Sequence, residues 1–314
     1  SKATAYVENH QLYVVDGEGK KHQLSTDGSR NVLYGSAVHR NEFGIKKGTF
    51  WSPDGQPLAF YRMDQSMVTT YPQVDISPRS AELVPDKYPM AGETSHKVTV
   101  GVFDIATGRI IYLDAGDPTD RYFTNIAWSP DDQYIYMIEL NRDQNHAQLV
   151  RYNATTGKKD AVLFDEKNDK YVEPMHPIQF LPWDSNKFIY QTRKDGYLHI
   201  YLYDTTGKEL KQLTKGTFEV INVLGFNTKD KTIIYTSNEC NPLQQNSYAV
   251  DMKGKRTLLD EGSGWHTPRL SKSGGMLLDI WSSPEVCKKF DLRTIGKKMS
   301  TRNLLTSAEP WDAY

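Results

Sequence analysis

The sequence predicts an all-β fold, a β-propeller of four-stranded blades, and three observations lead to this prediction. Tyr, Thr, Val and Ile are frequent, with 19 Tyr among 314 residues, and such residues suit the pleated, half-buried surfaces of sheets. A Trp-Ser-Pro-Asp-Gly turn recurs along the chain, and a second kind of turn recurs in phase with it. Helical periodicity is nearly absent.

Each residue of the first turn, Trp-Ser-Pro-Asp-Gly, suits a tight turn for a physical reason. Proline presets φ, aspartate caps the turn locally, and glycine accepts a positive φ. Full or degraded copies occupy residues 51–55, 128–132, 180–184, 226–230 and 270–274. Once an insertion at residues 72–95 is set aside, successive copies lie about 44 to 53 residues apart. A repeat of roughly this length, with four strands in each unit, is the period of propeller blades.

The second turn is a hairpin between aromatic-rich strands, and it occurs once in each interval between the first turns. Its copies occupy residues 15–19, 103–108, 152–157, 203–207 and 250–254. Together the two turns predict five whole blades near residues 46–117, 121–168, 174–217, 219–262 and 265–307. Residues 1–35 supply only part of a sixth blade. We therefore expect an N-terminally incomplete portion of a larger propeller, followed at residues 308–314 by the start of a linker.

Charge and composition exclude several classes of function. The chain has 38 basic and 39 acidic residues and no long run of one sign, so no one-signed face for nucleic acid or an anionic membrane is expected. No apolar run approaches the roughly 20 residues of a membrane-spanning helix. The sequence begins Ser1-Lys2 without an initiator Met, which is typical of a trimmed piece of a longer protein.

Catalytic and metal-binding patterns are also lacking. Gly-x-Ser-x-Gly does not occur, the eight histidines are scattered without ligand spacing, and no cofactor is implied. Structural or surface roles are expected for these histidines, and a blade-packing role for His199. Cys240 and Cys287 follow the second strands of successive blades, about 10 Å apart, so two free thiols are expected rather than a disulfide.

Glu42 is the best candidate for a functional residue. It stands in the polar segment at residues 39–45, which is expected to join two blades, where propellers present side chains toward their central opening. A carboxylate there could accept two or three charge-assisted hydrogen bonds from an ammonium group. The alternatives are a salt bridge with Arg40 or Lys46, or plain solvation.

Several long motifs resemble the propeller of dipeptidyl peptidase IV-type serine peptidases. They are His-Arg-Asn-Glu-Phe-Gly-Ile at residues 39–45, the segments at 48–55 and 58–67, and shorter matches at 88–92, 171–177 and 195–204. The likeness covers essentially the whole chain, and within the family it is strongest to the bacterial prolyl tripeptidyl aminopeptidases.

The resemblance implies a parent protein with an eight-bladed propeller and a C-terminal α/β-hydrolase domain that carries Ser, Asp and His. Such a propeller gates a cavity and binds the free N-terminus of a peptide that is cleaved after proline. Family members often use adjacent glutamates for this; here Glu42 matches one, and Asn41 precedes it as a possible second contact. Because Asn41 stands where many family members have a second glutamate, the sequence leaves open whether the peptidase releases two or three residues. This segment alone lacks the triad and should be inactive.

The resemblance has three further implications. The insertion at residues 72–95 matches an arm that contacts a second subunit in the family, and its proline and charge content permits either such an arm, with a homodimer, or a mobile loop. The location would be periplasmic or at the cell surface. The competing hypothesis is a stand-alone propeller that acts as a protein- or glycan-binding scaffold.

Overall fold

The computed structural model describes residues 3–309, and it is built almost entirely of antiparallel strands. The chain forms two compact units, Ser1–Ile178 and Gln179–Tyr314, which are described separately below. Within the described range, no helix is long and apolar enough to cross a membrane. The expected all-β fold is therefore confirmed, while residues 310–314 of the expected linker lie outside the described residues.

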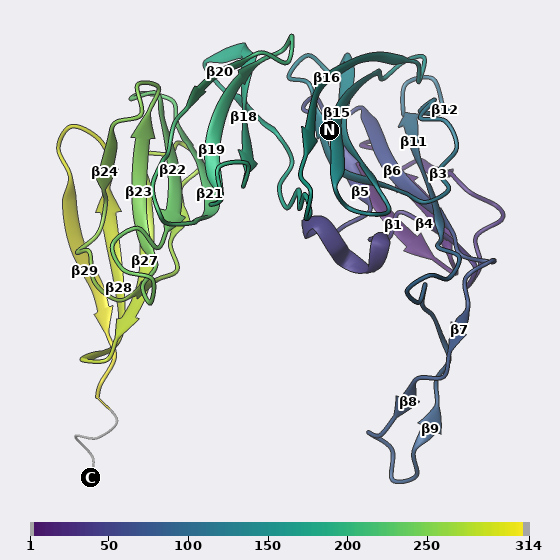
Figure 1. The fold of residues 1–314 in the computed structure, drawn as a ribbon, viewed down its shortest axis with the longest axis horizontal. Helices are drawn as coiled ribbons and strands as arrows, with labels where there is room; N and C mark the ends of the chain where they lie inside the picture. Colours follow the sequence, from purple (N-terminus) through teal and green to yellow (C-terminus); the bar gives the residue numbers. More distant parts are fainter. Residues whose placement is uncertain (1–2, 310–314) are drawn as a thin grey trace. The chain divides into compact units, whose positions relative to one another are not determined.

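The first unit contains three large sheets (Figure 1). The first sheet has three strands, β1 (Thr4–Glu8), β2 (Gln11–Val15) and β3 (Lys21–Gln23). The second sheet consists of β4 (Val32–Tyr34), β5 (Thr49–Trp51), β6 (Pro57–Asp64), β11 (Lys97–Asp104) and β12 (Arg109–Tyr112). The third sheet consists of β13 (Arg121–Trp128), β14 (Tyr134–Asn141), β15 (His146–Asn153) and β16 (Lys159–Lys167).

The strand pairing of the second sheet differs from one predicted blade boundary, the one near residue 35. The spacing of the turns predicts that Val32–Tyr34 belongs to the preceding blade at residues 1–35, but β4 pairs with β6 of the second sheet. The eight-residue β6 is too long for β5 alone, which covers only residues 58–60, so β4 pairs with residues 62–64. The edge of this sheet is thus one interrupted strand, and residues 35–48 loop out of the interruption.

The second unit contains three more sheets (Figure 1). The fourth sheet has β17 (Gln179–Leu181), β18 (Asp184–Thr192), β19 (His199–Asp204) and β20 (Glu209–Gln212). The fifth has β21 (Val220–Asn227), β22 (Thr232–Ser237), β23 (Asn246–Asp251) and β24 (Arg256–Leu258). The sixth has β25 (Trp265–His266), β26 (Arg269–Leu270), β27 (Met276–Ser283), β28 (Val286–Thr294) and β29 (Ser300–Thr306). Both cysteines are free, and His199 is fully buried in β19.

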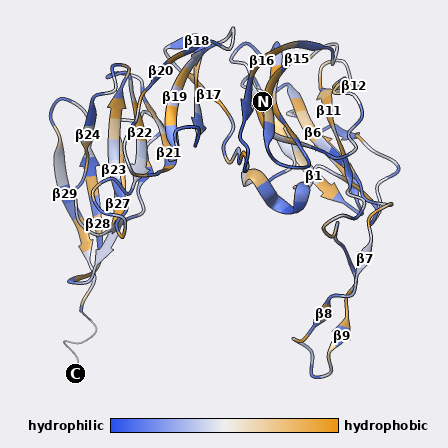
Figure 2. Cartoon of the chain, viewed as in Figure 1, coloured by the Kyte–Doolittle hydropathy of each residue, from blue (hydrophilic) through white to orange (hydrophobic). Residues whose placement is uncertain are grey.

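Apolar side chains from consecutive sheets form the cores of each unit. Leu12 and Phe60 belong to a cluster shared by the first and second sheets, and Tyr61 and Phe123 to one shared by the second and third. The fourth and fifth sheets share a similar cluster. Figure 2 shows hydrophobic residues along the central strands of the sheets. Neighbouring residues of β6, Phe60 and Tyr61, therefore pack against different sheets. This packing, with side chains of one strand alternating between the two adjacent sheets, is expected of blades.

The recurrent turn has the geometry that its residues predict. Ser52 Oγ donates to Asp54 Oδ1 at 2.6 Å, and the Gly55 N–H donates to the Ser52 carbonyl at 3.0 Å, with Gly55 at φ 76°. The second copy repeats the Ser–Asp contact at 2.6 Å, with Asp132 at φ 60° in the position of the glycine. Asp tolerates this left-handed conformation better than most residues.

The insertion at residues 72–95 is mostly a two-stranded arm. β7 (Thr70–Tyr71) pairs with β10 (Asp86–Lys87) at its base, and β8 (Val74–Asp75) pairs with β9 (Glu82–Leu83) toward its tip. Figure 1 shows the arm extending away from the sheets of the first unit. Several apolar side chains on it are exposed, including Ile76 at 84% and Leu83 at 63%.

Candidate functional site

The candidate site is the segment η1 (His39–Gly44), which lies inside the interrupted strand of the second sheet. This position corrects the expectation that the segment joins two blades, because β4 before it and β5 after it pair with the same β6. No local pattern indicates this pairing, because the pairing of a three-residue strand depends on a distant partner. The segment is therefore a loop that emerges from the edge of one blade.

The backbone of η1 is strained. His39, Arg40, Asn41 and Phe43 all have φ between 52° and 65°, and only Glu42 has φ −61°. Non-glycine residues adopt positive φ uncommonly, and each such residue raises the conformational energy of the chain. Strain of this kind persists only where the surrounding structure imposes it, and it concentrates at binding and catalytic sites.

His39 is the principal buried support of the loop. Its Nδ1 lies 2.8 Å from His96 Nε2, and its Nε2 accepts a hydrogen bond from the Phe123 N–H at 3.1 Å. The ring also packs edge-on against Tyr122, with centroids 5.0 Å apart. Burial, together with the neighbouring His96, lowers the pKa of His39 well below its usual value. The residue is therefore a neutral, fully enclosed support.

Phe43 and Gly44 fix the other end of the loop. Phe43 is buried and its ring lies 5.1 Å from that of Tyr122. Gly44 has φ 72°, and a Cβ added there would lie 2.2 Å from the Met175 carbonyl oxygen. Only glycine allows this close approach of two backbone segments.

Glu42 is held between these supports with its side chain exposed. Among the described residues its carboxylate has no hydrogen-bond or ion-pair partner, so neither of the salt bridges considered from the sequence forms. Arg40 pairs instead with Asp86 at 2.7 Å, and Lys47 lies over the Phe50 ring. Asn41 is also exposed. Arg40 and Lys47 are thus engaged elsewhere, and within residues 3–309 neither Arg40 nor Lys46 forms an ion pair with the carboxylate of Glu42.

Arg40 also connects the loop to the arm. Besides its ion pair with Asp86 in β10, its guanidinium lies 5.2 Å from the Tyr88 ring centroid. A cavity of about 390 Å³ opens at this junction, lined by Arg40, Tyr71, Gln73, Asp86, Tyr88 and Met90. The loop that carries Glu42 and the base of the arm are therefore in direct contact.

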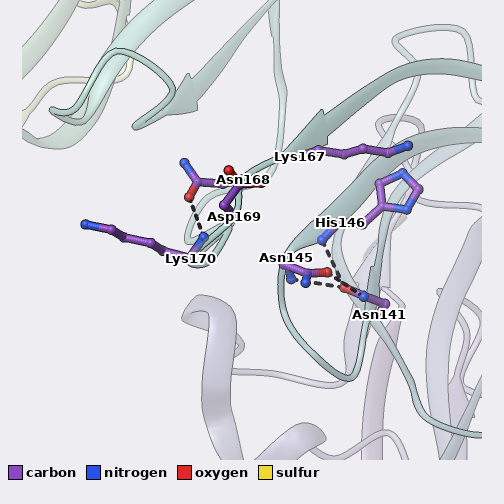
Figure 3. A pocket seen from close by; sticks show the side chains of 7 residues that line it. All are labelled: Asn141, Asn145, His146, Lys167, Asn168, Asp169 and Lys170. Carbon is purple, nitrogen blue, oxygen red and sulfur yellow. Dashed lines mark hydrogen bonds between the residues drawn. The ribbon is translucent and has the colours of Figure 1, made fainter.

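A cavity of about 940 Å³ in the first unit is a different feature (Figure 3). It is lined by polar residues of the β14–β15 turn and of the segment after β16, and Glu42 is not among them. Asn141 Oδ1 accepts hydrogen bonds from the backbone N–H groups of Asn145 and His146, and the imidazole of His146 contacts Asp165 at 2.6 Å. These side chains satisfy one another or face solvent, and they form no nucleophile-and-base arrangement.

One group in the second unit brings three potential metal ligands within 4.8 Å, namely Asp260, His266 and Asp279. His266 Nδ1 donates to Asp279 Oδ2 at 2.8 Å, and Nε2 donates to the Ser263 carbonyl at 2.7 Å. Arg293 Nε donates to the same Asp279 oxygen at 2.9 Å. Because both nitrogens of His266 act as donors and Arg293 supplies a second cation, this arrangement is a buried ion-pair network.

The scattered histidines predict only structural or surface roles, and this pattern does not reveal the contacts of His39 and His96 with the Glu42 loop. Their partners lie 57 and 84 positions away along the chain. The only available signal was that His39 stands three residues before Glu42.

Repeated four-stranded antiparallel sheets, packed face to face, define a β-propeller protein, here with an exposed carboxylate on a strained loop. The family model described as "Dipeptidyl peptidase IV (DPP IV) N-terminal region" matches residues 1–288. The chain belongs to this family.

Curated relatives agree with this assignment. A probable dipeptidyl-aminopeptidase B of Phaeosphaeria nodorum is 27% identical over 91% of this chain and 35% of the relative. The dipeptidyl peptidase 4 of Trichophyton rubrum is 26% identical over 91% of this chain and 39% of the relative. The chain therefore spans less than two fifths of the length of these relatives.

Solved structures give the same fold. A Bacteroides ovatus protein described as a dipeptidyl aminopeptidase IV superposes with a TM-score of 0.89 and 46% identity, over 99% of this chain and 46% of that one. The Porphyromonas gingivalis dipeptidyl peptidase 4 superposes with a TM-score of 0.86 and 26% identity, over 97% of this chain and 44% of that one.

Proposed function

We propose that this chain is the substrate-binding propeller of a serine exopeptidase that cleaves after proline, and that Glu42 binds the N-terminal ammonium group of the peptide. The observation that carries the proposal is the exposed carboxylate of Glu42, which has no partner within residues 3–309 although cationic residues surround it in the sequence. A carboxylate held in this way can form two or three charge-assisted hydrogen bonds with an ammonium group. Membership of the dipeptidyl peptidase IV family supports the same ligand.

In this mechanism the propeller supplies position and the catalytic chemistry lies elsewhere. A C-terminal α/β-hydrolase domain of the full-length protein would provide Ser, Asp and His, and this segment alone would be inactive. The distance from Glu42 to the serine would decide how many residues precede the cleaved bond. Asn41, whose amide is also exposed, is proposed as a second contact to the peptide.

The test is Glu42→Gln in the full-length protein. We expect KM for a peptide with a free N-terminus to rise strongly and kcat to fall, because the scissile bond is misplaced. With the native enzyme, binding should weaken above about pH 8, where the substrate amine loses its proton. Glu18→Gln, an exposed glutamate in the first sheet's hairpin turn, is the control. Unchanged kinetics in Glu42→Gln would refute the amine-binding role.

The length of the released peptide follows from the same assay. A comparison of Xaa-Pro with Xaa-Yaa-Pro substrates decides between dipeptidyl and tripeptidyl release. The alternative hypothesis, a stand-alone binding scaffold, makes the opposite prediction, namely that the full-length protein cleaves neither substrate.

The arm is proposed as the site of homodimerisation, supported by its exposed apolar side chains. Ile76→Asp should shift the full-length protein toward monomer in sedimentation velocity measurements at several concentrations. Leu243→Asp, which alters a leucine of the second unit that is 88% exposed, is the matched control. Equal sedimentation of Ile76→Asp and the native protein would show that the arm does not form the dimer interface.

A periplasmic or cell-surface location is proposed from the family alone, and fractionation with antibody detection tests it.

A further inference from the structure

Two buried histidines meet beneath the loop that carries Glu42. His39 belongs to η1 itself, whereas His96 directly precedes β11 at the point where the arm returns to the sheet. Both side chains are buried, and Phe123 of β13 supplies the third member through its backbone N–H. Three segments that are distant in sequence are thus joined through two imidazole rings.

The hydrogen bonds define the protonation of the pair. The Phe123 N–H can only donate, so Nε2 of His39 is the unprotonated nitrogen of a neutral ring. Nδ1 of His39 therefore carries the proton and donates to Nε2 of His96 at 2.8 Å. His96 is in turn neutral, with its proton on Nδ1. Burial and the nearby guanidinium groups of Arg142 and Arg40 lower the pKa of His96 and favour this neutral form.

The loop needs such a support because its backbone does not favour its own conformation. His39, Arg40 and Asn41 are consecutive non-glycine residues with positive φ. A short run of this kind reverts to extended or right-handed conformations unless tertiary contacts oppose it. The contacts of His39 occur at the first strained residue, where they determine the direction in which the rest of the loop leaves the sheet.

We propose that His39 is a positioning residue for substrate binding: paired with His96 and with the Phe123 N–H, it holds the left-handed loop in the conformation that presents Glu42 to the peptide amine. The inference rests on the proposed function of Glu42. His39 itself is enclosed and does not touch the substrate.

The test uses three variants of the full-length protein. His39→Phe keeps an aromatic ring against Tyr122 but removes both hydrogen bonds. His39→Gln restores an acceptor for the Phe123 N–H. His199→Phe is the matched control, because His199 is equally buried, is hydrogen-bonded through both nitrogens and lies edge-on to Phe218 at 4.8 Å in the second unit.

We expect KM for a free-amine peptide to rise about 10- to 100-fold in His39→Phe, with a smaller change in kcat, since misplacement of one binding group by about 1 Å can cost this much. His39→Gln should recover part of the loss, and His199→Phe should leave KM unchanged. Amide hydrogen exchange across residues 38–45 should accelerate in His39→Phe but not in His199→Phe. Should this variant fold poorly, His96→Phe tests the same pair from its other side and should show the same KM rise.

The outcomes separate this inference from the proposed function. If Glu42→Gln raises KM while His39→Phe and His96→Phe do not, the positioning role is wrong and amine binding by Glu42 stands. A second outcome is that both histidine variants accelerate exchange in the loop while Glu42→Gln leaves KM unchanged. The histidines then support the loop, but the proposed function of Glu42 is wrong, and so is the positioning role in substrate binding. Equal KM rises in His39→Phe and His199→Phe would reduce the effect to general destabilisation and overturn the inference.

Discussion

The guanidinium of Arg40 lies 2.7 Å from the carboxylate of Asp86, so the loop that presents Glu42 is ion-paired to the base of the arm. Both side chains are nearly half exposed, and Arg40 also contacts the Tyr88 ring. Exposed ion pairs contribute little free energy. The importance of this ion pair is that it connects the Glu42 loop to the base of the arm. A change in the arm and a change in the loop should each affect the other.

Arg40→Ala should therefore loosen the arm without unfolding the sheets. We expect faster amide hydrogen exchange across residues 82–90 and a loss of no more than about 1 kcal/mol in the free energy of unfolding. Lys21→Ala is a matched control, because Lys21 also combines an exposed ion pair, to Glu8, with a contact over the Tyr13 ring. Unchanged exchange in the arm of Arg40→Ala would contradict the connection.

Gly44→Ala should destabilise the protein much more than Gly55→Ala. The two glycines have similar φ values, 72° and 76°, so the conformational cost of about 1–2 kcal/mol is common to both. Only at position 44 would the new Cβ meet a backbone atom, the Met175 oxygen at 2.2 Å, and relief of that contact should cost about 1–3 kcal/mol more. Thermal unfolding of the two variants measures the difference. Equal losses would show that the Met175 segment can move.

The His39–His96 pair predicts a loss of stability in acid. Burial, with the neighbouring Arg142 and Arg40, lowers the pKa of His96 to about 4. Between about pH 6.5 and 4 the unfolded chain therefore binds a proton at His96 that the folded chain does not bind. The contribution is fully present above about pH 6.5 and is lost as the pH falls toward 4, by about 3 kcal/mol in free energy of unfolding. His96→Phe should show a shallower decline over this range. Parallel curves for the two proteins would mean that His96 titrates normally.

The His266–Asp279 pair predicts the opposite dependence. Burial lowers the pKa of His266, but the hydrogen bond to Asp279 and the charge of Asp260 outweigh it, and the net pKa is raised. The stabilisation is therefore complete below about pH 6.5 and is lost as the pH rises through the raised pKa. Nitrogen-15 NMR should show both ring nitrogens of His266 protonated at pH 7. A neutral-tautomer spectrum would contradict this network.

Removal of one partner from that network should be costly. Asp279→Asn leaves the buried cations Arg293 and His266 undercompensated, and we expect a loss of about 3–5 kcal/mol in the free energy of unfolding. Asp165→Asn, which alters the more exposed His146–Asp165 pair, is the control and should cost less than about 1 kcal/mol. Comparable losses in the two variants would show that burial adds nothing to the pair.

The blades could be predicted from the sequence because their signals are local. A Ser-Pro-Asp-Gly turn sets its own geometry, as the Ser52–Asp54 contact shows, and the strand that follows it, β6, is a short run rich in apolar residues and bounded by turn residues. Glu42 could be singled out because it is a carboxylate within a segment that resembles a known family.

The conformation of the Glu42 loop could not be predicted, because distant contacts impose it. Neither Arg40 nor Phe43 has any intrinsic preference for positive φ. Their conformation depends on His96 and Phe123, which lie far along the chain, and on the close approach of Met175 to the loop. The pairing of β4 with β6 escaped prediction for the same reason, since three residues carry too little pattern to identify a partner.

The left-handed residues on either side of Glu42, at positions 39–41 and 43–44, also limit how the ligand specificity of this loop could be re-engineered. In a saturation library at positions 40, 41 and 43, members with Val, Ile or Thr should be disfavoured, because β-branched residues rarely adopt the left-handed region of the Ramachandran map. Position 42 has ordinary dihedral angles and an exposed side chain, so its backbone conformation does not restrict substitution in the same way. Variation aimed at new ligands should therefore sample residue 42, restrict residues 40 and 41 to types that tolerate a positive φ, such as Asn, Asp and Gly, and keep the buried Phe43.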